Sequence, residues 1–328
     1  MTRTRFVHTV ETATMVVMAE RIHDDELDTA EATVRALLRA QCPQWSQLPL
    51  SYLRTSGTDH AMWRICMSND DDVVVRLPRR ARSGETLRRE LELLTLIATS
   101  PLAGVVATPT LRHMGEPTDA FPHPWAVLDW LDGSDAWTVR HDLEPSAEQF
   151  AVDLAAAIRV IGRLTDLPAS TRQPGERGGP IEPLLVRLDR WLCDPAWNAT
   201  ELLDVDAVKR SADECFEVAG EPIAVGFVHG DLIPGNLLTQ NGRLTAIIDW
   251  GGAAYADPAQ DLGPAWSVFD ERGRRVFRDA VGADDATWLR ARTFELEHAI
   301  GGVLYYTPRH HPLADVMART LRRILHDE

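Results

Sequence analysis

Lysine is almost absent from this sequence. Lysine and arginine together number 34 among 328 residues, yet Lys209 is the only lysine. Any fixed cation needed in the N-terminal half must therefore be an arginine. The four cysteines lie far apart and form no C-x-x-C pair: Cys42, Cys66, Cys193 and Cys215. This spacing argues against a disulfide framework or a zinc site, so we expect reduced structural thiols and a cytoplasmic location.

Long apolar runs and basic charge are also lacking. The sequence contains no run of about 18 apolar residues, so it predicts no membrane span. The short apolar stretch 12–19 has no signal-peptide pattern. The net charge of −15 makes nucleic acid and anionic membranes poor partners. An acidic surface could attract cationic small molecules or serve solubility alone. We expect a monomer or homodimer, with residues 1–23 as a leader that need not be ordered.

The remaining composition is that of a globular protein large enough for two lobes, with 45% hydrophobic and 25% charged residues. Helical spacing of apolar residues predicts helices over residues 24–42 and 85–99. Short β-type runs predict five strands before residue 131, and mostly helices follow. The predicted strands cover residues 51–56, 62–67, 73–77, 108–114 and 125–130. A small β-rich half therefore precedes a larger α-rich half, which indicates an α+β fold.

The segment from Val228 to Leu237 carries the strongest chemical signal. It follows a strand and reads V-H-G-D-L-I-P-G-N-L, so Pro and Gly make it a loop. Asp231 and Asn236 stand five residues apart in this loop. Asp231 can orient a substrate hydroxyl or accept its proton, and the Asn236 carbonyl oxygen can bind Mg²⁺. The spacing equals the Asp-x-x-x-x-Asn of the kinase catalytic loop.

A second signal follows at residues 245–251, T-A-I-I-D-W-G. An apolar strand ends at Asp249, 18 residues after Asp231, and a hairpin return would bring this carboxylate near Asn236. Asp-aromatic-Gly matches the magnesium-binding Asp-Phe-Gly of kinases in residue type. The alternative that these aspartates only form turns or cap helices is weakened by their coincidence at strand–loop boundaries.

Together, His229-Gly-Asp-x-x-x-x-Asn and Ile-Ile-Asp-Trp-Gly resemble the aminoglycoside phosphotransferase family, and Arg76 lies in a segment similar to Arg-Leu-Pro-Arg of macrolide phosphotransferases. The resemblance covers roughly residues 24–325 and includes Asp257-Pro-x-x-Asp261-Leu. It implies a bilobal, protein-kinase-like fold with a small antiparallel-sheet N-lobe over residues 24–130. A larger, mainly helical C-lobe would cover residues 131–328. By the same resemblance, His229 and Asp261 would support the catalytic loop.

The resemblance also implies a nucleotide site that binds ATP or GTP with Mg²⁺ held by Asn236 and Asp249. Arg76 would replace the phosphate-binding lysine of kinases and pair with Glu90, a glutamate on the edge of an apolar helical stripe. A turn at Ser56, Gly57 and Thr58 would meet the phosphates. Backbone groups of the hinge would bind the base, at Asp129, Trp130 and Leu131.

The acceptor is a small molecule with a hydroxyl group, and an aminoglycoside-type antibiotic is the leading hypothesis. Acidic residues of the C-terminal part could bind its ammonium groups: Asp135, Asp270, Glu271, Glu295 and Glu297. A macrolide, or a metabolite such as choline, homoserine or a sugar, is the first alternative. A pseudokinase that binds a nucleotide or an antibiotic without catalysis is the second. The cleft motifs do not separate the acceptors, because fold resemblance does not fix function.

Overall fold

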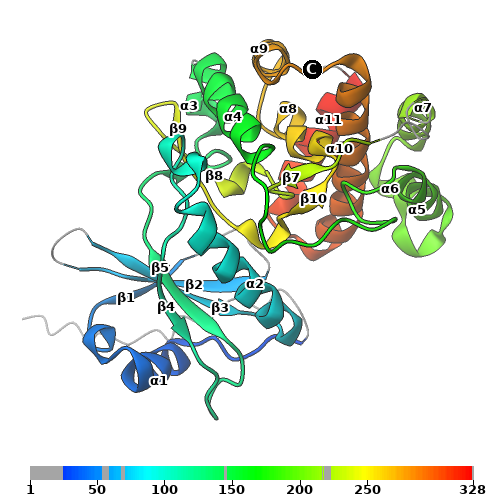
Figure 1. Ribbon diagram of the computed structural model, residues 1–328. Coiled ribbons are helices and arrows are strands. Elements are labelled where there is room, and N and C mark those ends of the chain that lie inside the picture. Colours follow the sequence, from blue (N-terminus) through cyan, green and yellow to red (C-terminus); the bar gives the residue numbers. More distant parts are fainter. Residues whose placement is uncertain are drawn as a thin grey trace, which may run out of the picture.

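The computed structural model describes residues 25–53, 59–67, 71–143, 146–215, 217 and 223–326. Figure 1 shows a small lobe built on a sheet and a larger lobe built mainly of helices. This arrangement confirms the bilobal α+β fold. The expectations for the leader 1–23 and for the turn at Ser56, Gly57 and Thr58 lie outside the described residues.

The small lobe contains a five-stranded antiparallel sheet in the order β1-β2-β3-β5-β4. The second and third strands pair along their length, with Ile65 opposite Val73 and His60 opposite Pro78. The strands are β1 (Leu50–Leu53), β2 (His60–Ile65), β3 (Val73–Pro78), β4 (Leu111–Gly115) and β5 (Trp125–Asp129).

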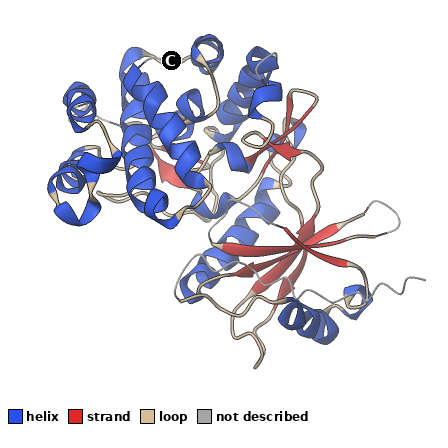
Figure 2. Cartoon of the chain, turned by 180° about the vertical axis from the view of Figure 1, so that it is seen from behind, coloured by secondary structure: helices blue, strands red, loops and turns tan. Residues whose placement is uncertain are grey.

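Two helices lie on the two faces of this sheet, as Figures 1 and 2 show. Helix α1 (Glu31–Gln41) buries Val34 and Leu37 in one apolar cluster with Val73, Val75 and other residues of one face. Helix α2 (Ala81–Ile97) covers the face to which Val74 belongs. Because side chains alternate along a strand, neighbouring residues of β3 serve different cores.

Helix α1 begins later than the sequence predicted, at Glu31 instead of residue 24. The Asp28 carboxylate accepts hydrogen bonds from the backbone N–H of Ala30 and the hydroxyl of Thr33, which fixes an extended start before the helix. The backbone N–H of Leu27 donates to Arg79 O at 2.7 Å. The helical spacing of apolar residues also includes Leu27, but hydrogen bonds hold the chain extended there, so the predicted helix start was wrong.

The larger lobe combines helices with three short antiparallel strand pairings. Strand β6 pairs with β8, β8 with β9, and β7 with β10. The strands are β6 (Ser134–Asp135), β7 (Gly226–Val228), β8 (Leu237–Gln240), β9 (Arg243–Ile247) and β10 (Ala254–Ala256). The helices are α3 (Arg140–Leu143), α4 (Ala147–Ile161), α5 (Glu182–Cys193), α6 (Ala199–Leu202), α7 (Val205–Cys215), α8 (Pro264–Ser267), α9 (Glu271–Val281), α10 (Asp285–Tyr306) and α11 (Leu313–His326).

One apolar core connects the lobes. Leu87, Leu91 and Leu94 of α2 are buried in the same cluster as Phe150 of α4 and Trp250 of the larger lobe. Helix α2 thereby fixes the small sheet against the strand ends of the larger lobe. Within the described part of the chain, no helix is both long and apolar enough to cross a membrane.

Candidate active site

The loop between β7 and β8 carries the predicted catalytic aspartate. Gly230 has φ +80°, and a Cβ at this position would lie 2.2 Å from the carbonyl oxygen of Gly252. Only glycine tolerates this combination of left-handed backbone and close approach. The loop thus turns sharply between His229 and Asp231 and leaves the Asp231 side chain one-third exposed.

Asp261 holds this loop through its backbone. The completely enclosed carboxylate accepts hydrogen bonds from His229 N at 2.7 Å and from Gly230 N at 2.8 Å. Burial raises the pKa of Asp261 to about 7, against the influence of the two N–H donors. These contacts are the ones that the family resemblance implies for a loop-supporting aspartate.

His229 links the same loop to the end of β9. Its Nδ1 accepts a hydrogen bond from Asp231 N at 3.3 Å, so the proton lies on Nε2, which is 3.1 Å from Ile248 O. Burial lowers the pKa of His229, which keeps the ring neutral. The ring also packs edge-on against Trp250 at a centroid distance of 4.6 Å. A neutral, enclosed histidine of this kind braces two loops.

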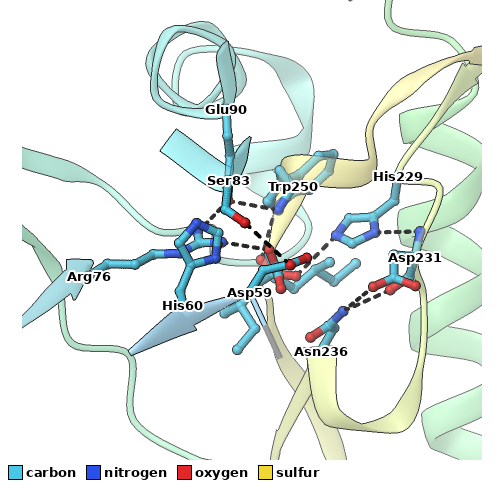
Figure 3. A network of polar contacts seen from close by, with 12 residues as sticks. Asp59, His60, Arg76, Ser83, Glu90, His229, Asp231, Asn236 and Trp250 are labelled. Atoms are coloured by element: carbon cyan, nitrogen blue, oxygen red, sulfur yellow. Dashed lines mark hydrogen bonds and ion pairs between the residues drawn. The ribbon is translucent and has the colours of Figure 1, made fainter. Parts of the chain in front are cut away.

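Asp231 and Asn236 lie together, as Figure 3 shows. The Asn236 amide nitrogen donates to Asp231 O at 2.9 Å and lies 3.3 Å from Asp231 Oδ2. Because the side-chain nitrogen of Asn236 faces Asp231, its side-chain oxygen points away from Asp231. Asn236 is thereby oriented by the residue that we expect to face the substrate hydroxyl.

Asp249 is brought next to Asn236 by the β8–β9 pairing. The backbone N–H of Ile248 donates to Asn236 O at 3.0 Å, one residue before Asp249. Asp249 itself has φ +63°, an uncommon conformation for a non-glycine residue, and such strain concentrates at functional sites. The sequence predicted this hairpin return, although strand β8 itself was not recognised.

Arg76 joins the small lobe to Asp249. Its Nη1 donates to Glu90 Oε1 at 2.6 Å, and its Nη2 donates to Asp249 Oδ1 at 2.7 Å. Burial raises the pKa of Glu90. Burial also favours a neutral Asp249, but the nearby Arg76 outweighs this effect and lowers the pKa of Asp249. Glu90 Oε1 also accepts from Trp250 N at 3.0 Å.

The oxygen donors at this place suit a magnesium ion shared with a nucleotide. Among the described residues, no group of three or more His, Cys, Asp or Glu side chains could hold a metal ion. Mg²⁺ commonly needs only one or two protein oxygens, because phosphates and water supply the rest. Asn236 and Asp249 provide one amide oxygen and one carboxylate, and the Asp249 side chain is 39% exposed. The residues therefore fit the predicted ion.

The predicted hinge connects β5 to β6 between the lobes. The backbone N–H of Trp130 donates to Asp72 O at 3.0 Å, and that of Asp129 donates to Thr110 O at 2.9 Å. The guanidinium of Arg64 lies 4.1 Å from the centre of the Trp130 ring. Leu131 lies in the segment between β5 and β6 that connects the two lobes. Base recognition by these residues stays a prediction.

Two features beside the catalytic residues were missed from the sequence. The His60 ring lies 3.0 Å from Arg76 Nη2. Arg177 Nη2 lies 3.6 Å from Asp231 Oδ1, and it belongs to the Pro- and Gly-rich segment 170–180. That segment is fixed by hydrogen bonds from Tyr255 N to Ser170 O and from Asp257 N to Gly178 O, both 2.8 Å. No spacing rule would reveal either contact.

A pocket of roughly 270 Å³, open mouth included, adjoins Asp231, with Arg177, Glu295 and His298 in its lining. Glu295 is therefore the acidic acceptor candidate that this pocket contains. The other four candidates have different contacts. Asp135 accepts from Thr138, Asp270 caps α9 at Gly273 N, Glu271 pairs with Arg275, and Glu297 pairs with Arg187.

Comparisons with known proteins identify the family to which the chain belongs. Residues 53–294 match the profile of the phosphotransferase enzyme family, APH, and the chain belongs to this family. Over 46 residues the chain is 46% identical to the uncharacterized protein YcbJ of Bacillus subtilis. This match spans 15% of that protein and 14% of the chain.

Solved structures of aminoglycoside and macrolide phosphotransferases share the fold. The GDP and kanamycin complex of APH(2″)-IIIa is 18% identical with a TM-score of 0.69, covering 90% of this chain and 97% of that one. Macrolide 2′-phosphotransferase type I is 21% identical with a TM-score of 0.61, covering 92% and 99%. The macrolide 2′-phosphotransferase MphH of Brachybacterium faecium is 20% identical with a TM-score of 0.55, covering 85% and 92%.

Proposed function

We propose that this phosphotransferase moves the γ-phosphoryl group of ATP or GTP to a hydroxyl group of a small molecule. The contacts of Arg76 with Glu90 and Asp249 in one lobe-spanning network, together with the Asn236–Asp231 contact, carry this proposal. Phosphoryl transfer depends mainly on positioning and charge neutralisation, and these side chains can supply both. Solved relatives with the same fold contain GDP or ADP, which supports a nucleotide donor.

Each residue then has a definite task. Asp231 orients the acceptor hydroxyl and receives its proton as the bond to phosphorus forms. Arg76 binds phosphate oxygens while Glu90 holds its guanidinium in place. Asn236 and Asp249 hold Mg²⁺, which when bound neutralises charge on the phosphates. His229 and Asp261 keep the catalytic loop in position.

For the acceptor, we propose an aminoglycoside-type antibiotic, which would make the protein a resistance kinase. Glu295 beside Asp231 supports this choice because a carboxylate attracts ammonium groups. Arg177 lines the same pocket, and its positive charge favours a less cationic acceptor. This mixture of charge supports a macrolide or a small-metabolite alcohol as the second candidate.

The deciding experiment is a coupled nucleotide-turnover assay with Mg²⁺, run separately with ATP and GTP. The acceptor panel contains aminoglycosides, macrolides and small metabolite alcohols. Turnover that one acceptor class stimulates, with a phosphorylated product found by mass spectrometry, is the expected result. The matched control is Asp231→Asn, which keeps the size of the side chain and removes the base.

Two outcomes would count against the proposal. If neither nucleotide binds in the presence of Mg²⁺, the hypothesis that this site transfers phosphoryl groups is refuted. If nucleotide binds but Asp231→Asn turns over acceptors at the wild-type rate, Asp231 is not the base. Chelation of Mg²⁺ is expected to stop turnover, and added Mg²⁺ is expected to restore it.

A further inference from the structure

His60 is a buried histidine at the nucleotide side of the site. It opens β2, directly opposite Pro78 of β3, and 7% of its surface is exposed. Figure 3 shows its ring beside Arg76, with Asp59 and Ser83 next to them. Its Nδ1 lies 3.0 Å from Arg76 Nη2. None of the tasks assigned above uses this side chain.

The contact with Arg76 determines where the imidazole carries its proton. A guanidinium group has donors and no acceptor, so Nδ1 of His60 must accept from Arg76. A proton on both ring nitrogens would break this hydrogen bond and place two cations together. Burial and the charge of Arg76 both lower the pKa of His60, in agreement with a neutral ring. Nε2 therefore carries the hydrogen and is a donor.

This donor has no acceptor within the described part of the chain. His60 Nε2 is buried and makes no hydrogen bond, although buried polar groups in proteins are normally paired. Glu90 Oε2, on the other partner of Arg76, is likewise buried and unpaired. Two unsatisfied polar atoms thus flank the same arginine, and leaving such groups unsatisfied is costly.

We propose that His60 binds the nucleotide by donating a hydrogen bond from Nε2–H to a phosphate oxygen. The inference rests on the proposed function and assigns a second phosphate-binding side chain to that site. Arg76 orients the ring through Nδ1, so one arginine contacts the phosphates and also directs the donor beside it.

Phosphate is the acceptor that the surroundings favour. Its oxygens carry negative charge and can accept several hydrogen bonds at once, from the guanidinium and from the imidazole. The Asp249 end of the network is open, since that side chain is 39% exposed while Arg76 is 4% exposed. A neutral donor adds affinity for phosphate without adding a second buried cation.

The test compares binding of the triphosphate and of the matching nucleoside. Calorimetry would measure the Kd of a non-hydrolysable ATP or GTP analogue with Mg²⁺, and of adenosine or guanosine, for wild type, His60→Phe and His60→Gln. His60→Phe keeps a ring and removes the donor, and we expect it to weaken triphosphate binding about 10- to 100-fold, as for a lost hydrogen bond to a charged group. Nucleoside binding should change less than about threefold.

Two variants control for packing. His60→Gln keeps a donor and an acceptor, so it should recover most of the triphosphate affinity. His113→Phe removes another histidine of the same sheet, which packs at 5.5 Å against Trp125 in the core on the other face. This variant should bind both ligands like the wild type.

A spectroscopic measurement separates the proposed contact from a structural role. In protein labelled with ¹⁵N-histidine, the signal absent from His60→Gln identifies His60, and its shifts report an Nε2–H tautomer. This signal should move when the triphosphate analogue is added and stay in place with the nucleoside. Equal loss of both ligands in His60→Phe, or an unmoved signal, would overturn the inference. A wild type that binds no nucleotide would overturn the proposed function with it.

Discussion

Arg76 and Arg79 lie three residues apart at the end of β3, and both are almost fully buried beside a carboxylate. Arg79 donates to Glu26 Oε2 at 3.1 Å, to the Tyr52 hydroxyl at 2.6 Å and to His60 O at 3.2 Å. These partners belong to the small lobe, and the Glu26 side chain is as enclosed as that of Arg79.

Arg76 instead has partners on both lobes. Glu90 belongs to α2, whereas Asp249 follows β9 of the larger lobe and is partly exposed. Removing one member of an enclosed ion pair leaves an uncompensated charge, but an exposed partner can be exchanged for a ligand. The comparison indicates that Arg79 stabilises the small lobe and that Arg76 serves the site. The following variants test this division.

Removing the exposed partner should have the largest effect. Asp249→Ala takes away a proposed magnesium ligand, and Arg76 keeps Glu90 as its partner. We expect turnover to fall about 10³-fold or more, comparable to the loss of a catalytic group, with the circular dichroism spectrum unchanged. Asp231→Ala should behave in the same way. Normal turnover in well-folded Asp249→Ala would refute the metal assignment.

Removing the enclosed arginine should mainly destabilise the protein. Arg79→Met leaves Glu26 buried without its cation, which costs about 3–5 kcal/mol of unfolding free energy. Urea titration would measure this loss. Turnover per folded molecule at low temperature should stay within about tenfold of the wild type, since Arg79 contacts the backbone oxygens of Asp59 and His60 and not the residues proposed to bind Mg²⁺ or the substrate hydroxyl. A stable but inactive variant would reverse the roles of the two arginines.

A conservative change at Arg76 should lower turnover more than stability, the reverse of the result expected for Arg79→Met. Arg76→Lys keeps the charge near Glu90 but loses the planar guanidinium that contacts Glu90, Asp249 and His60 together. We expect kcat/KM for the nucleotide to fall about 10- to 100-fold, equivalent to about 1.4–2.8 kcal/mol. The urea midpoint should change less than in Arg79→Lys. A larger loss of stability at residue 76 would contradict the comparison.

An exposed pair sets the baseline. Arg275 and Glu271 lie one turn apart on α9, with 67% and 63% of their side chains exposed. Arg275→Ala should change the unfolding free energy by less than about 0.5 kcal/mol, because solvent screens such a pair. Thermal unfolding and turnover would both be measured. A change as large as that of Arg79→Met would show that burial is not what separates the pairs.

The sequence predicted the two lobes and the approximate positions of the small-lobe strands, because periodicity and turn residues act locally. It also predicted that Glu90 would need a cationic partner, and the family resemblance implied that this partner is Arg76. It failed at the start of α1, where Leu27 is held extended by the backbone of Arg79, a contact 52 positions away in the chain. Hydrogen bonds between distant segments do not change the spacing of apolar residues, so the sequence pattern does not reveal them.

The acceptor side shows the same limit. Five acidic residues were equal candidates by composition, and Glu295 differs from the other four because it lines the pocket beside Asp231. Arg177 approaches Asp231 because segment 170–180 is hydrogen-bonded to β10 and to Asp257. Neither contact follows from spacing, because each depends on how distant segments pack. The predicted catalytic motifs were recognisable because Asp231 and Asn236 stand five residues apart in one loop and Asp249 follows 18 residues after Asp231.

The presence of arginine at position 76 has a practical consequence for chemical biology. Reagents that label nucleotide-binding proteins through a lysine amine find no such group at this site, because Lys209 is the only lysine and lies exposed on α7. Surveys based on amine-reactive nucleotide probes would therefore overlook this protein. The same Lys209 offers a single side-chain amine for attaching a fluorophore or a surface, away from the residues proposed to bind phosphate.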